Sequence, residues 1–144
     1  MKRLAPALAV LALLAAPSPA QQPEKLPDVG PGGYQMTTYY VGFLYRGPAW
    51  TPESTPETQK LQEAHMANIV RMQKEGKLLV AGPFLDGGDL AGLYIFKAGS
   101  AEEARALVAT DPAVAAGRLR FELHAWYAAR NITVTATGEP GPAK

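Results

Sequence analysis

The order of hydrophobic periodicities constrains the fold of this 144-residue chain more than any other feature. Residues 37–46 are dense in aromatic and β-branched side chains, and residues 119–130 alternate between apolar and polar, so both segments indicate strands. Between them, residues 78–84 and 90–97 form two short apolar runs separated by the letters DGGD. Because such a sequence is typical of a hairpin turn, we expect these two runs to pair as antiparallel strands.

A long segment with a period of 3.6 residues separates the first two strands and predicts a helix over residues 56–75. The side chain of Ser54 or Thr55 is expected to accept a hydrogen bond from the first turn, with Glu57 at capping-box spacing from Ser54. Gly76 is expected to end the helix in a left-handed conformation.

A second helical segment follows the hairpin. It starts at Ser100, where a serine precedes two glutamates, and it runs to about residue 109. The dipeptide Asp111-Pro112 ends this helix, and residues 113–117 are expected to add one further turn.

The resulting order, β-α-β-β-α-β, predicts the ferredoxin-like arrangement, an α+β fold in which an antiparallel sheet carries both helices on one face. The first strand has bulky apolar side chains on both of its faces. We therefore expect the uncovered face to pack against a second copy of the chain, which gives a homodimer built as a dimeric α+β barrel. A monomer with an exposed aromatic patch is the alternative.

The N-terminus has the pattern of a secretory signal peptide. Lys2 and Arg3 precede an apolar run over residues 4–16, and Ser18 and Ala20 place small residues at the −3 and −1 positions of a cleavage site. The run is shorter than the roughly 20 residues that span a bilayer, although an uncleaved anchor is the alternative. The sequence therefore predicts a periplasmic or secreted protein.

The expected domain organisation follows from these limits. Residues 1–20 are the signal peptide, residues 21–33 a Pro- and Gly-rich flexible linker, residues 34–131 the folded domain, and residues 132–144 a flexible tail.

Composition excludes several classes of function. Removing residues 1–20 takes away two of the 14 basic residues and none of the 13 acidic ones, so the formal net charge changes from +1 to −1. This balance, without a basic cluster, argues against nucleic acid or a membrane surface as partner. The chain has no cysteine, so disulfides, thiolate metal sites and a cysteine nucleophile are excluded.

Several segments in this order carry a resemblance to a known family. His65 lies in AHMANIVRMQKEGKLL, which is followed by VAGPF, by GLYIF and by SAEEARALVATDP, and the closing strand ends near Trp126. Over residues 39–131 the chain resembles the YCII-related proteins. The resemblance implies a ferredoxin-like dimer with a site around a histidine and an aspartate that match His65 and Asp111. Some members are dehydrochlorinases of chlorinated aromatic diols. The signal peptide departs from the usual cytosolic members.

The topology brings the same residues together independently of the resemblance. In a β-α-β-β-α-β fold, the early part of the first helix and the ends of the second strand and second helix share one edge. His65, Gly82, Pro83 and Asp111 are thereby expected to be neighbours. A hydrogen bond from one imidazole nitrogen to Asp111 would leave the other free to take a proton from a substrate. The alternative is a structural core histidine with an aspartate that caps or ends a helix.

The remaining polar residues give weaker indications of function than His65 and Asp111. Arg46, at the end of the first strand, is a candidate substrate-binding residue for an anionic group, or a solvated arginine. His124 is expected to be structural, on a sheet face or interface. Two histidines without H-x-H or H-x₃-H spacing predict no metal site, and no cofactor motif is present.

Three classes of function remain open. The first is a lyase (dehydrochlorinase-like) or hydrolase-like enzyme that uses His65 and Asp111 on a small aromatic or carbonyl-bearing molecule. The second is a periplasmic binding protein for small molecules, and the third is a dimeric scaffold without a pocket function. The sequence does not identify the substrate.

Overall fold

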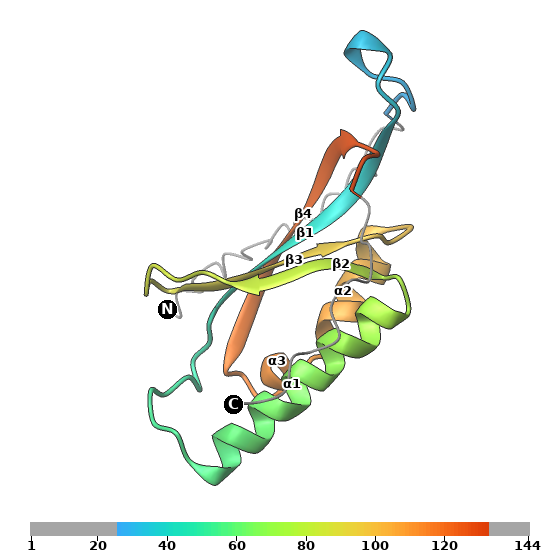
Figure 1. Ribbon diagram of the computed structural model, residues 1–144. Helices are drawn as coiled ribbons and strands as arrows, with labels where there is room; N and C mark the ends of the chain where they lie inside the picture. Colours follow the sequence, from blue (N-terminus) through green and yellow to red (C-terminus); the bar gives the residue numbers. More distant parts are fainter. Residues whose placement is uncertain (1–25, 133–144) are drawn as a thin grey trace, which may run out of the picture.

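The computed structural model describes residues 26–132 and shows a four-stranded antiparallel sheet with its helices on one face (Figure 1). The elements follow in the order η1 (Pro31–Gly33), β1 (Met36–Arg46), α1 (Pro56–Lys74), β2 (Leu78–Pro83), β3 (Leu90–Phe96), α2 (Ala101–Ala109), α3 (Pro112–Ala115) and β4 (Leu119–Ala129). The strand order is β2-β3-β1-β4, and each neighbouring pair is antiparallel. This is the order of the ferredoxin-like arrangement, so the α+β prediction is confirmed.

The expected signal peptide, the start of the linker and most of the tail lie outside the described residues. The part of the expected linker that is described closes a turn in front of β1. Val29 forms an isolated bridge with Gln35, the Met36 N–H donates to the Asp28 carbonyl, and η1 lies between. No helix within residues 26–132 has the length and apolarity needed to cross a membrane.

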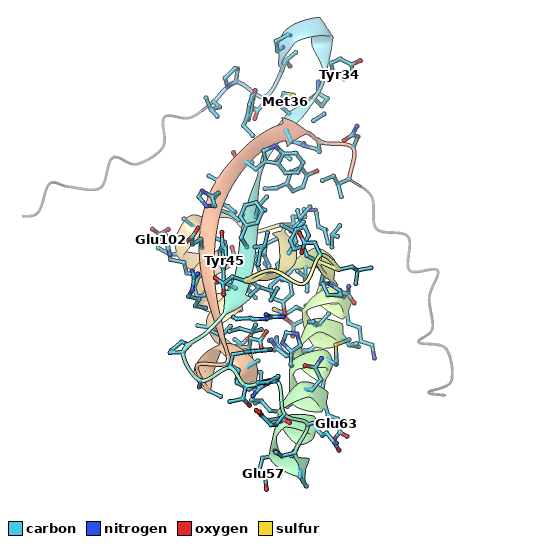
Figure 2. All side chains as sticks on the ribbon, turned by 90° about the vertical axis from the view of Figure 1, so that its left-hand side faces the viewer. Tyr34, Met36, Tyr45, Glu57, Glu63 and Glu102 are labelled. Carbon is cyan, nitrogen blue, oxygen red and sulfur yellow. The ribbon has the colours of Figure 1, made fainter. Side chains whose placement is uncertain are left out.

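The turn stands at the end of a two-stranded ribbon. β4 pairs with β1 from Met36 onward, whereas β3 pairs with β1 only from Tyr40 onward. The first residues of β1 and the last residues of β4 therefore extend beyond the four-stranded sheet, and Figure 2 shows this ribbon rising to the turn that carries Tyr34 and Met36. Tyr34 is 65% exposed there.

The start of α1 confirms Thr55, one of the two expected caps, and corrects the expected capping box. The N-cap is Thr55, whose hydroxyl accepts from the Thr58 N–H, while the Thr58 hydroxyl accepts from the Thr55 N–H. A capping box joins the N-cap to the third helical residue, and Pro56 is the first, so Ser54 and Glu57 do not form the box. At the other end, Gly76 has φ 69°, the left-handed cap that was expected.

The core lies between the sheet and the helices. Alternate residues of β1 and β3 point toward the helices and meet the buried faces of α1 and α2. The buried cluster consists of Tyr40, Leu44, Ile69, Met72, Leu78, Tyr94, Phe96, Ala104 and Val108. Each large member contributes roughly 1.5–3 kcal/mol through removal of apolar surface from water.

The opposite face of the sheet has no helix over it. Val41 and Phe43 alternate with core residues of β1 and pair with Ile95 and Leu93 of β3, so all four side chains lie on this face, where they are half-buried. His124, the histidine expected on a sheet face, packs edge-on against Phe43 with 5.7 Å between ring centroids. The centre of the open face is therefore apolar.

Candidate functional site

His65 and Asp111 lie in direct contact, although 46 positions separate them in the chain. His65 projects from α1, and Asp111 is the residue that precedes α3. The imidazole Nδ1 is 2.9 Å from Asp111 Oδ1 and 2.8 Å from Oδ2. The side chain of His65 is 12% exposed and that of Asp111 is fully buried. A carboxylate only accepts hydrogen bonds, so Nδ1 is the ring nitrogen that carries a proton here.

Asp111 is held by three donors. His65 is one, the Tyr94 hydroxyl donates to Oδ2 at 2.9 Å, and the Ala113 N–H donates to Oδ1 at 2.9 Å as the cap of α3. Burial favours the neutral acid, but the hydrogen bond and charge of His65, helped by Ala113 and Tyr94, outweigh it and lower the pKa of Asp111. The residue is therefore an anion at neutral pH.

Tyr94 is a site residue that the sequence reading missed. Its ring lies nearly parallel to the imidazole of His65, at 20° and 6.4 Å between centroids, and the residue is 1% exposed. Burial, followed by the negative charge of Asp111, raises the pKa of Tyr94, so the hydroxyl stays a donor. The available signal was its inward position in β3, because a buried tyrosine hydroxyl usually finds a hydrogen-bond partner.

A cavity of about 420 Å³ opens beside His65. Its walls come from α1 and from all four strands, and most of them are apolar. The lining residues are Leu44, Gln62, His65, Met66, Ile69, Ala81, Gly82, Pro83, Ala91, Gly92, Tyr94 and Leu119. Within the described residues, the wall contains no aspartate, glutamate, lysine or arginine. Because Nδ1 is engaged by Asp111, Nε2 is the imidazole nitrogen left for a molecule in the cavity.

The other predicted substrate-binding residues divide into two groups. Gly82 and Pro83 line the cavity from β2. Arg46 is not among its lining residues, and its guanidinium instead lies 4.1 Å from the ring centroid of Trp50. Gly92 lines the wall where β2 and β3 approach closely, because a Cβ at this position would lie 2.8 Å from the Gly82 carbonyl oxygen.

A second polar cluster, formed by Arg71, Asn68 and Thr110, lies next to the His65–Asp111 pair in the chain. Arg71 Nη2 donates to Asn68 Oδ1 at 2.8 Å and to the Thr110 hydroxyl at 2.9 Å. Asn68 lies one turn after His65, and Thr110 directly precedes Asp111. The cluster therefore ties the part of α1 that carries the histidine to the chain segment that carries the aspartate.

The described residues contain no group of three or more His, Asp or Glu side chains placed to hold a metal ion. The chemistry that the site itself offers is proton transfer by an imidazole, because His65 lines an apolar cavity and its Nδ1 donates to a buried carboxylate.

Fold and site together define a small α+β domain with a buried His–Asp pair at the wall of an apolar cavity. Residues 39–126 match the model of the YCII-related domain, so the chain belongs to the YCII-related domain family. It is also similar to the uncharacterized protein YjpA of Bacillus subtilis (strain 168), with 34% identity over 76 residues that cover 50% of this chain and 87% of YjpA.

A solved structure is also similar to this chain. It is 5-chloro-2-hydroxyhydroquinone dehydrochlorinase (TftG) from Burkholderia phenoliruptrix AC1100 in complex with 2,5-dihydroxybenzoquinone. The identity is 26%, the match covers 62% of this chain and 93% of that chain, and the TM-score is 0.45.

Proposed function

We propose that this protein is an enzyme that moves a proton on a small neutral molecule, with His65 as acid and base and Asp111 as its orienting partner. The observation that carries the proposal is the contact of the imidazole with a buried carboxylate on one side and with an apolar cavity on the other.

The hydrogen bond to Asp111 assigns the roles of the two imidazole nitrogens. Nδ1 donates to the carboxylate, so Nε2 has a free lone pair and accepts a proton from the ligand. The fixed negative charge of Asp111 then stabilises the imidazolium. A positioned general base of this kind contributes roughly 10²–10⁴-fold to a rate.

Two reaction types use this proton transfer. In a lyase, Nε2 removes a C–H or O–H proton, and the electron pair left behind forms a double bond as a leaving group departs with its own pair. A dehydrochlorination is a reaction of this type, with chloride as the leaving group. In a hydrolase, Nε2 removes the proton from a water molecule that attacks a carbonyl carbon. The π electron pair of the C=O bond moves to its oxygen, and when the C=O bond re-forms, the bond to the leaving group breaks. The imidazolium then gives its proton to solvent in the lyase and to the leaving group in the hydrolase.

The cavity indicates the class of ligand. Its volume of about 420 Å³ is within the usual range for small-molecule sites. With no lysine or arginine among the lining residues and the anionic Asp111 behind His65, carboxylates and phosphates are disfavoured. We therefore propose an uncharged, largely apolar ligand, either a hydroxylated aromatic or a carbonyl compound with an acidic C–H bond.

The test follows proton exchange, because it requires no knowledge of the full reaction. The full chain is incubated in D₂O with a panel of such compounds, and loss of C–H signals is followed by NMR. We expect exchange by the unmodified protein and a fall of about 10²-fold or more in His65→Gln. His124→Gln is the matched control, since His124 lies on the open sheet face, and it is expected to exchange normally.

Two outcomes would count against this function. Equal exchange by His65→Gln would remove the histidine from the chemistry. Tight binding of the compounds by every variant, with no exchange by any, would instead favour a binding protein that uses the same apolar cavity.

We also propose that the protein is exported and works as a homodimer. The signal-peptide pattern of residues 1–20 supports export to the periplasm or beyond, and mass spectrometry of an envelope fraction tests it by searching for a chain that begins at Gln21. The apolar centre of the open sheet face supports the dimer. Arg120 and Glu122, which pair with Tyr45 and Phe43 of β1, form an ion pair of 3.6 Å beside this apolar region.

A further inference from the structure

We infer that Tyr94 is a positioning residue that fixes the orientation of both His65 and Asp111, an inference that rests on the proposed function of this pair. Tyr94 contacts both members. Its hydroxyl is 2.9 Å from Asp111 Oδ2, and its ring lies nearly parallel to that of His65, which belongs to a different element.

The carboxylate plane depends on Tyr94. The Ala113 N–H, which belongs to the backbone of α3, holds Oδ1, and the Tyr94 hydroxyl, on the central strand β3, holds Oδ2. Rotation of the carboxylate about its Cβ–Cγ bond would therefore break both hydrogen bonds. His65 Nδ1 approaches both oxygens almost equally, so the imidazole takes its direction from that plane.

The aromatic ring adds a second constraint. Tyr94 is 1% exposed and packs edge-on against Phe96 at 5.6 Å between centroids, so its ring position is set by the core. The imidazole lies nearly parallel to this fixed ring, and a tilt away from that arrangement would lose the aromatic contact. Tyr94 therefore limits both the hydrogen bond of His65 and the direction in which Nε2 faces the cavity.

Tyr94→Phe separates these two contributions, since it keeps the ring and removes only the hydroxyl. Tyr40→Phe is the matched control. Tyr40 is also a buried tyrosine of the same sheet face, at 6% exposure. Within the described residues, neither an aromatic pair nor a hydrogen bond joins it to His65 or Asp111, in contrast to Tyr94.

The first readout is the NMR signature of the pair in the full chain. ¹⁵N shifts of the imidazole report which nitrogen carries the proton, and the ¹³Cγ shift of Asp111 reports its titration. In Tyr94→Phe we expect the Nδ1–H tautomer of neutral His65 to lose population, because the carboxylate is no longer held in the plane that Nδ1 meets. We expect the titration midpoint of Asp111 to rise, because a donor to its carboxylate is lost. Tyr40→Phe is expected to change neither.

Identical spectra for Tyr94→Phe and the unmodified protein would overturn the inference. A second measurement needs no variant and therefore does not depend on correct folding of Tyr94→Phe. In the unmodified chain, the Tyr94 hydroxyl proton should be protected from exchange and show cross-peaks to the ring protons of His65. Absence of the protected proton or of the cross-peaks would also count against the contact of Tyr94 with the pair.

These readouts separate the inference from the proposed function. If the His65 and Asp111 signals shift in Tyr94→Phe but the unmodified protein exchanges protons on none of the compounds, the proposed function is contradicted and the positioning role of Tyr94 is retained. Where a substrate is found, Tyr94→Phe is expected to lower kcat by roughly 10²-fold with a smaller change in KM, as misorientation of a catalytic group does.

Discussion

Asp111 combines two roles that the sequence presents as alternatives. It caps α3 through the Ala113 N–H, and it accepts the hydrogen bond of His65. The two are compatible because a carboxylate has two oxygens with about four acceptor sites. The hydrogen bond that starts the helix therefore also holds the carboxylate in the plane that His65 meets.

Replacing Asp111 should change stability in a pH-dependent way. Its pKa is lowered in the folded protein, so the carboxylate stabilises the fold above its unfolded pKa of about 3.9, and this contribution is lost as pH falls through the folded-state value. We expect Asp111→Asn to be less stable by roughly 3 kcal/mol at pH 7, because buried donors lose their charged acceptor.

Urea unfolding at pH 7 and pH 3 measures this effect. The difference in the free energy of unfolding between the unmodified protein and Asp111→Asn reports the contribution of Asp111 alone, because the other carboxylates are the same in both. We expect this difference to be smaller at pH 3 than at pH 7. A difference that is the same at both pH values would contradict a lowered pKa.

The two glycines of the cavity wall should respond differently to a methyl group. A Cβ at Gly92 would lie 2.8 Å from the Gly82 carbonyl oxygen, whereas a Cβ at Gly82 would meet no atom within 4 Å. We expect Gly92→Ala to cost roughly 1–3 kcal/mol through overpacking of the backbone. Gly82→Ala should be neutral or slightly stabilising, because glycine in a strand is unfavourable by roughly 0.5–1 kcal/mol. Thermal unfolding of both variants measures the two changes in stability. Equal losses of stability in Gly92→Ala and Gly82→Ala would contradict the close approach at Gly92.

Most elements could be predicted from local pattern, because each strand and helix shows its period over enough residues. The bounds of α1 were expected at residues 56–75 and are Pro56–Lys74. The expected capping box between Ser54 and Glu57 was wrong because several Ser, Thr and Glu residues crowd this segment, and only the backbone conformation decides which one precedes the first helical residue. Thr55 is in the extended conformation, with φ −106° and ψ 164°, which an N-cap requires.

The capping box makes a prediction at the scale of the helix. Thr55→Ala removes the acceptor for the Thr58 N–H and should lower the free energy of unfolding by about 1 kcal/mol. The control is Ser54→Ala, since Ser54 only accepts an exposed side-chain bond from Gln59, and its loss should change stability by less than about 0.5 kcal/mol. Chemical denaturation compares the two, and a larger effect at Ser54 would contradict the assignment of Thr55 as the N-cap.

At the scale of the whole molecule, the open sheet face is the surface on which apolar side chains are not covered by a helix. Helices cover one side of the sheet (Figure 1). The other side carries half-buried apolar side chains from β1 and β3. Trp126 is 44% exposed on the same side, beside Tyr39. A second copy would remove this surface from water and stabilise both domains.

Phe43→Glu tests the dimer, because it places a charge in the centre of the open face. We expect sedimentation to show a dimer for the unmodified protein and a monomer for Phe43→Glu. Leu85→Glu is the matched control, since Leu85 is 94% exposed at the hairpin tip and should leave the assembly unchanged. A monomeric unmodified protein would exclude the dimeric barrel.

The sequence by itself determined the elements, their order, and the pairing of His65 with Asp111 at one edge, because hydrophobic period and strand order follow from local composition and chain topology. Only the tertiary structure decided that Tyr94 joins the pair and that Arg46 stacks on Trp50 instead of lining the cavity. These outcomes depend on side-chain directions and on distances of a few ångströms between segments far apart in the chain. Local pattern does not encode such distances, whereas packing of the whole core sets them.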